Sequence, residues 1–153
     1  MKKIHNFSAG PCILPQTVLE ASAEAVREFD GMGLSLIEIS HRSKNFERVM
    51  DDARQLVKDI LKLEDRFEVL FLQGGATLGF YMVPLNCLPS GAKAAYSNTG
   101  VWASGAIKEA KLVGEIDVVA DSSASNHNHI PDLPELKDYA YFHYTSNNTI
   151  YGT

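Results

Sequence analysis

The feature that most constrains the fold of this chain is the alternation of strand-like and helix-like patterns in its second half. Short apolar runs alternate with amphipathic segments, and glycines mark several of the junctions. In chain order the patterns are strand 67–73, helix 76–88, strand 92–99, helix 100–114, strand 115–121, a short helix at 132–138 and strand 139–146. Such alternation is typical of βαβ units. We therefore predict an α/β fold with a mostly parallel sheet and flanking helices.

The first half has a different pattern. Apolar residues recur at helical spacing in 16–30 and again in about 45–63, and "SLIEIS" (35–40) is predicted to be short and extended. Residues 1–15 form an N-terminal arm that is too apolar for a solvated tail, so it is expected to lie on a surface. We predict an arm over 1–15 and a domain over 16–153.

Composition excludes several classes of protein. The net charge is −5 and the fourteen Lys and Arg residues form no block, which argues against a nucleic-acid partner. No apolar segment is long enough to cross a membrane, and the N-terminus is a poor signal peptide. Cys12 and Cys87 form no CxxC motif, which favours a reduced compartment and no metal site. The expectation is a cytoplasmic protein.

A glycine turn follows the apolar run 69–72. Gly74 and Gly75 allow positive φ and a close approach of the backbone to a ligand, and Thr77 lies near the start of the next predicted helix. Free amides at a helix N-terminus, together with a hydroxyl, favour an anion such as phosphate. The alternative is a tight turn that holds no ligand.

Two further residues are predicted at the same edge of the sheet. Trp102, the single tryptophan, follows "SNTG" after a strand, and Thr149 follows the last strand. An indole can stack on a flat heteroaromatic ring, although a tryptophan packed on the sheet and a threonine in a turn are the simpler alternatives. Together with the glycine turn, these residues indicate a phosphorylated aromatic cofactor.

Five ordered segments carry a resemblance to a known family. The segments "HNFSAGPCILP", "SLIEISHRSKNF", "LFLQGGATLGF", "NTGVWASGAIKEAK" and "HYTSNNTIYGT" are similar to those of the phosphoserine aminotransferases, and they span nearly the whole chain. These are class V, fold-type I enzymes that depend on pyridoxal 5'-phosphate. The resemblance implies the N-terminal part of their large domain. It also implies a homodimer that converts phosphoserine and 2-oxoglutarate to 3-phosphohydroxypyruvate and glutamate in serine biosynthesis.

The resemblance also implies roles for individual residues. For the cofactor, it matches Ala76 and Thr77 to the phosphate, Trp102 to ring stacking, and Thr149 to the phenolic oxygen. For the substrate, it matches His41 and Arg42 to anionic groups and Ala9 to a loop nearby. A guanidinium suits carboxylate or phosphate, whereas a solvated turn is the simpler interpretation of the pair.

No catalytic residue is expected in this chain. In the family, the Schiff-base lysine and the acidic partner of the ring nitrogen lie downstream of the "NNTIYGT" match. The lysines considered as substitutes lie in unsuitable places, namely Lys44, Lys93, Lys108 and Lys111. A complementary C-terminal segment is therefore expected as a partner, and the chain alone is expected to be inactive.

Two alternatives stay open at this point. One is another class V aminotransferase, for example one that acts on alanine and glyoxylate, although the "HR" pair and the "NFSAGP" start favour the phosphoserine branch. The other is a non-catalytic phosphate-binding domain that ends naturally at Thr153, which the lack of a catalytic lysine would support.

Overall fold

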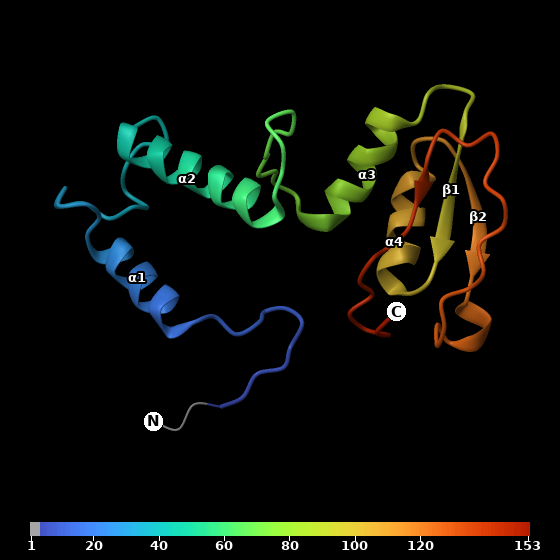
Figure 1. Cartoon of the computed structure of the whole chain (residues 1–153), viewed down its shortest axis with the longest axis horizontal. Coiled ribbons are helices and arrows are strands. Elements are labelled where there is room, and N and C mark those ends of the chain that lie inside the picture. Colours follow the sequence, from blue (N-terminus) through green and yellow to red (C-terminus); the bar gives the residue numbers. More distant parts are fainter. Residues whose placement is uncertain (1–3) are drawn as a thin grey trace. The chain divides into compact units, whose positions relative to one another are not determined.

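A computed structural model describes residues 4–153 (Figure 1). The chain divides into two compact units, one that extends to Phe71 and one over Leu72–Thr153, and each is described on its own. The predicted boundary between an arm and a domain at residue 15 falls inside the first unit and stays a prediction.

The first unit contains two helices. Helix α1 (Gln16–Arg27) follows Pro15, and α2 (Lys44–Leu61) begins after Ser43, whose hydroxyl accepts a hydrogen bond from the Phe46 amide at 3.4 Å. This side-chain cap satisfies one of the free amides of the first turn. Residues 4–15 form neither helix nor strand. The periodicity thus predicted both helices to within a few residues.

The segment 35–40 was predicted to be extended, and this is wrong. It forms turns, because the Glu38 carboxylate accepts a hydrogen bond from the Ser35 amide at 2.8 Å while the Glu38 amide donates to the Ser35 carbonyl at 3.0 Å. These two reciprocal bonds close the backbone on itself. Nothing in the apolar spacing of the segment reveals them.

The second unit is a three-stranded parallel sheet with helices. Strand β1 (Lys93–Asn98) lies between β2 (Glu115–Asp121) and β3 (Phe142–His143). The helices of this unit are α3 (Gly75–Cys87), α4 (Val101–Ala110) and the 3₁₀ turn η1 (Ser123–Ser125). The α/β prediction with a parallel sheet and flanking helices is confirmed.

The core of this unit forms where α4 packs on β1. Ala94 and Tyr96 of the strand are buried against Ala106, Ile107 and Ala110 of the helix. The small alanine side chains let the helix backbone approach the sheet closely, and α3 packs against α4 (Figure 1). This packing fixes where the N-terminus of α4 lies relative to β1.

An aromatic group closes one side of this core. The hydroxyls of Tyr96 and Tyr141 lie 2.9 Å apart, and the ring of His143 stacks on Tyr96 with centroids 4.6 Å apart. Burial and the neighbouring Tyr141 hydroxyl raise the pKa of Tyr96, and burial raises the pKa of Tyr141. Both hydroxyls therefore remain protonated, and one donates to the other, at ordinary pH.

Three predicted elements differ in the structure. Residues 67–73 form no strand, because their backbone has no strand partner among residues 4–153. Residues 132–138 form no helix, since Pro134 disfavours helical geometry at the preceding residue. The strand predicted over 139–146 is reduced to Phe142–His143, which are the residues that pair with β1.

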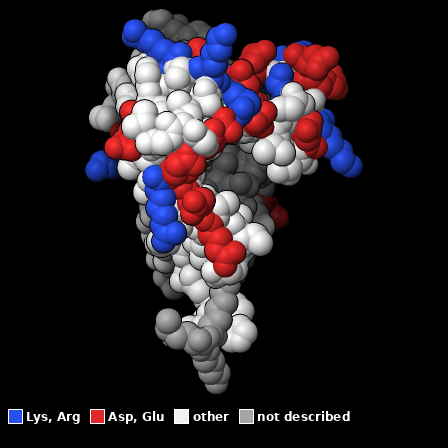
Figure 2. All heavy atoms as spheres, turned by 90° about the vertical axis from the view of Figure 1, so that its left-hand side faces the viewer, with Lys and Arg blue, Asp and Glu red and all other residues white. Residues whose placement is uncertain are grey.

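The described surface carries charges of both signs. On the face drawn in Figure 2, basic and acidic side chains are intermingled, and among its described residues no broad area is basic alone. No helix within residues 4–153 is long and apolar enough to span a membrane. That same part of the chain has no cluster of three or more His, Cys, Asp or Glu side chains that could hold a metal ion.

The turn before α3 yields a stability prediction. Gly74 has φ of 94°, and a Cβ there would lie 2.3 Å from Cδ2 and 2.6 Å from Cβ of Leu78. We expect Gly74→Ala to lower the free energy of unfolding by about 1–2 kcal/mol, because a left-handed conformation is costly for alanine. Urea denaturation of the whole protein measures this.

Gly79 is the matched control for Gly74. It lies inside the same helix, and a Cβ at that position meets no atom within 4 Å. Gly79→Ala is expected to raise the free energy of unfolding by about 0.5–1 kcal/mol, as alanine is the better helix residue. Equal stability of the two variants would contradict the inference that position 74 requires a glycine.

Candidate functional site

The site is built at the carboxyl edge of the sheet, where β1 leads into α4. The two residues Thr99 and Gly100 connect the strand to the helix, and both are buried. In parallel sheets this edge is where ligands bind, since the loops and the helix N-termini gather there. The edge carries a network of polar side chains, an exposed indole and a returning C-terminal loop.

The polar network joins the ends of β1 and β2. Asn98 donates to a carboxylate oxygen of Asp121 at 3.2 Å, and the hydroxyl of Ser104 donates to the Asn98 side-chain oxygen at 2.7 Å. Burial acts to raise the pKa of Asp121, but hydrogen bonds from Ser123 and Asn98 and the nearby His127 outweigh it, so this pKa is lowered. The Asp121 carboxylate is thus ionised and engaged in internal hydrogen bonds.

Trp102 and Thr149 meet at this edge. Trp102 lies in the first turn of α4 and keeps 44% of its surface exposed. Its indole N–H donates a hydrogen bond of 2.9 Å to the hydroxyl oxygen of Thr149. Because that oxygen accepts, the hydroxyl proton of Thr149 is free to be donated to another group. The structure therefore brings together two of the predicted cofactor residues, whose roles stay predictions.

The loop that carries Thr149 is fastened by the residue before it. Asn148 is 1% exposed and bonds to the strand-to-helix connection through its side chain, with Nδ2 donating to Thr99 Oγ1 at 2.9 Å. The sequence pattern singled out Thr149 but not Asn148. The only hint in the sequence is that Asn148 is next to Thr149. A run of polar residues such as "NNT" does not reveal that one of them is buried.

The start of α3 offers free backbone donors. Ala76 and Thr77 lie in its first turn behind the left-handed Gly74, and both are exposed. Among the described residues, no hydrogen bond uses their amides as donors, as expected for the first turn of a helix. An anion would satisfy these donors. No hydrogen bond within residues 4–153 links Ala76 or Thr77 to Trp102 or Thr149.

The predicted substrate residues belong to the first unit. His41 and Arg42 form the turn before α2, where the Arg42 amide donates to the Ser40 hydroxyl at 3.2 Å. The Arg42 guanidinium has no ion pair among residues 4–153, so it is available to an anionic ligand. Ala9 is exposed in the N-terminal segment. Their association with one another stays a prediction.

Three of the lysines that were considered as substitutes belong to the second unit. Lys93 begins β1 at the edge opposite Trp102 and pairs with Glu115 at 3.6 Å and Asp117 at 3.9 Å. Lys108 lies in the last turn of α4 and Lys111 directly follows that helix. None of these three is placed to reach a ligand at the carboxyl edge near Trp102.

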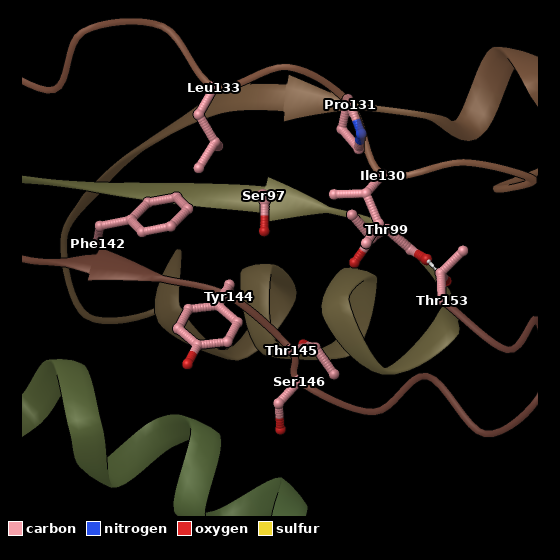
Figure 3. A pocket seen from close by; sticks show the side chains of 10 residues that line it. All are labelled: Ser97, Thr99, Ile130, Pro131, Leu133, Phe142, Tyr144, Thr145, Ser146 and Thr153. Atoms are coloured by element: carbon pink, nitrogen blue, oxygen red, sulfur yellow. Dashed lines mark hydrogen bonds between the residues drawn. The ribbon is translucent and has the colours of Figure 1, made fainter.

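A separate pocket of about 440 Å³ opens on the sheet face opposite α4 (Figure 3). Its walls are mainly apolar and include Phe142, Tyr144 and Ile130. At one end the Thr153 hydroxyl donates to the Thr99 carbonyl, drawn as a dashed line in Figure 3. None of the residues predicted to hold a cofactor lines this pocket, so the candidate site and this pocket are distinct.

Known proteins resemble the chain along its length. The family model for class-V aminotransferases matches residues 4–153. The phosphoserine aminotransferase of Flavobacterium psychrophilum is 58% identical over all of this chain and 43% of its own length. That of Parabacteroides distasonis is 56% identical over all of this chain and 42% of its length. The chain thus spans less than half the length of these relatives.

Solved structures of phosphoserine aminotransferases have a similar fold. A phosphoserine aminotransferase studied for radiation damage of its Schiff base has a TM-score of 0.92 at 42% identity, covering 100% of this chain and 43% of that one. A phosphoserine aminotransferase from Trichomonas vaginalis with bound PLP has a TM-score of 0.87 at 30% identity, covering 97% and 43%. Since the family match covers residues 4–153, this chain belongs to the class-V aminotransferase family.

Proposed function

We propose that the protein containing this chain is a phosphoserine:2-oxoglutarate aminotransferase that uses pyridoxal 5'-phosphate. The observation that carries the proposal is the contact of the Trp102 indole with the Thr149 hydroxyl, because the resemblance matches these two residues to the ring and the phenolic oxygen of one cofactor. Relatives named phosphoserine aminotransferase, at 53–58% identity, support the same substrate class.

The residues present fit the proposed cofactor. An exposed indole offers a flat face for a pyridine ring, and a hydroxyl 2.9 Å from its N–H has a proton left to donate to a phenolic oxygen. The free amides of Ala76 and Thr77, at the positive end of the α3 dipole, suit a phosphate. All four residues belong to the same compact unit.

When bound, pyridoxal phosphate supplies a conjugated ring that accepts electrons as the α-proton of the substrate leaves. Trp102 would keep that ring in a fixed plane by stacking. Thr149 would stabilise negative charge on the phenolic oxygen through a charge-assisted hydrogen bond. Ala76 and Thr77 would fix the opposite end of the cofactor. These residues bind and orient, and none of them moves a proton to or from the substrate.

The substrate residues would be Arg42 and His41, with Ala9 beside them. The guanidinium of Arg42, which has no ion pair within residues 4–153, can bind carboxylate or phosphate with two parallel hydrogen bonds. Ala9 has no polar side chain, so any polar contact from it would come from the backbone.

We assign the catalytic lysine and the acidic partner of the ring nitrogen to the part of the relatives' length that this chain does not span. We also propose a homodimer in the cytoplasm. The N-terminal segment supports a subunit contact, since Ile4 is 86% exposed and Phe7 is 94% exposed. Apolar side chains of this size are stabilised when a surface covers them.

The proposed reaction has a direct assay. We expect the whole protein to form glutamate from phosphoserine and 2-oxoglutarate, with kcat/KM about 10- to 100-fold above that for alanine and glyoxylate, because a charged contact to phosphate is lost with alanine. Steady-state kinetics with both substrate pairs measure the ratio. Preference for alanine and glyoxylate would assign the protein to another class V activity.

The stacking role of Trp102 is tested by two substitutions. Trp102→Ala is expected to weaken pyridoxal phosphate binding by about 5- to 15-fold, whereas Trp102→Phe, which keeps an aromatic plate, should retain most of the affinity. Equilibrium dialysis gives the affinities, and the melting temperature of the apoprotein checks the fold. If both variants bind as the wild type does, Trp102 does not contact the ring.

The role of Arg42 is tested through KM. We expect Arg42→Ala to raise the KM for phosphoserine by about 10- to 100-fold through loss of a charge-assisted contact. The visible spectrum of the bound cofactor should not change. Arg66→Ala is the control, since this exposed arginine of the same unit already pairs with Glu64 at 2.9 Å. Normal KM values in Arg42→Ala would remove Arg42 from the site.

A further inference from the structure

Asn148 is a buried polar side chain at the carboxyl edge. It is 1% exposed, and both polar atoms of its amide are used. Oδ1 accepts from the Ala103 amide at 3.4 Å, and Nδ2 donates to the Thr99 hydroxyl at 2.9 Å. Its backbone amide donates to the Thr153 carbonyl at 2.8 Å, and its carbonyl accepts from the Gly152 amide at 2.7 Å. The side chain of this residue therefore bonds the last loop to the β1–α4 connection. Its backbone forms hydrogen bonds within that loop.

The contact with Ala103 replaces an ordinary helix cap. The N-cap of α4 is Gly100, which has no side chain to bond to the amides of the first turn. Asn148 supplies the missing acceptor from 45 residues further along the chain. The Ala103 amide is buried, so leaving it without a hydrogen-bond acceptor would lower the stability of the protein.

Gly100 is needed for space rather than for conformation. Its φ of 162° is extended and open to any residue. A Cβ at this position would lie 2.5 Å from Oδ1 and 2.6 Å from Cγ of Asn148. Asn148 therefore occupies the space that a side chain at Gly100 would need, and such a side chain would displace Asn148 from the helix.

Asn148 is linked to both members of the indole–hydroxyl contact. Trp102 lies between Thr99 and Ala103, the two residues that the Asn148 side chain bonds to, and Thr149 directly follows Asn148. Accordingly, we propose that Asn148 is a positioning residue: it fixes Thr149 on the N-terminus of α4 so that the hydroxyl accepts from Trp102 and keeps its own proton for donation to the cofactor. This inference rests on the proposed function.

A double-mutant cycle in the whole protein tests the proposal. Asn148→Ala is expected to weaken pyridoxal phosphate binding by about tenfold, the effect of losing one hydrogen bond of ordinary strength. If Asn148 acts through Thr149, then adding Asn148→Ala to Thr149→Val should change the affinity by less than about threefold, because the two effects are not additive. Equilibrium dialysis measures all four proteins.

Two further measurements separate positioning from general stability. The pKa of the visible absorbance band of the bound cofactor should shift in the same direction in Asn148→Ala and in Thr149→Val, since both would remove the same hydrogen bond. Asn147→Ala is the matched control, an exposed asparagine next to Asn148, and it should behave as the wild type. Gly100→Ala should reproduce Asn148→Ala, and it takes the place of that variant in the cycle if Asn148→Ala does not fold.

Full additivity in the cycle would overturn the proposal. So would a lower melting temperature of the apoprotein with unchanged cofactor affinity and an unchanged absorbance pKa, because Asn148 would then only stabilise the loop. A protein that binds no pyridoxal phosphate in any form would refute the proposed function instead, and the two failures are thereby distinguished.

Discussion

The packing of α4 on β1 is the interaction on which the rest of the second unit depends. Ala94 of the strand and Ala106 and Ala110 of the helix are buried in one cluster, and their small side chains let the two backbones approach closely. This contact places the N-terminus of α4 at the carboxyl edge of a parallel sheet, with its free amides and positive dipole end. The last loop then docks on that helix end through Asn148, and Trp102 and Thr149 meet as a result.

The sequence predicted the elements whose signals are local. Helical spacing located α1 and α2, and the alternation of apolar runs and helices located β1, α4 and β2. The prediction was wrong where an element depends on pairing with another segment. The apolar run 67–73 forms no strand because a strand requires a hydrogen-bonded neighbour, and none of residues 4–153 provides one. A pattern of apolar residues shows that a strand is possible, but not that its neighbour is present.

The candidate site was predictable in its residue types and less so in its connections. Trp102 and Thr149 could be placed at one edge from the order of strands and helices alone, and the structure adds that they bond to each other. Asn148 could not be found in this way, because its importance comes from burial and from the absence of a side chain at Gly100. Both depend on packing between segments that are far apart in sequence.

A crystal structure of the whole protein grown with pyridoxal phosphate would show whether this edge binds the cofactor. We expect the ring against the Trp102 indole, its phenolic oxygen within hydrogen-bond distance of the Thr149 hydroxyl, and its phosphate at the amides of Ala76 and Thr77. A cofactor bound elsewhere, for example in the apolar pocket of Figure 3, with the Trp102 indole facing only protein, would contradict this expectation.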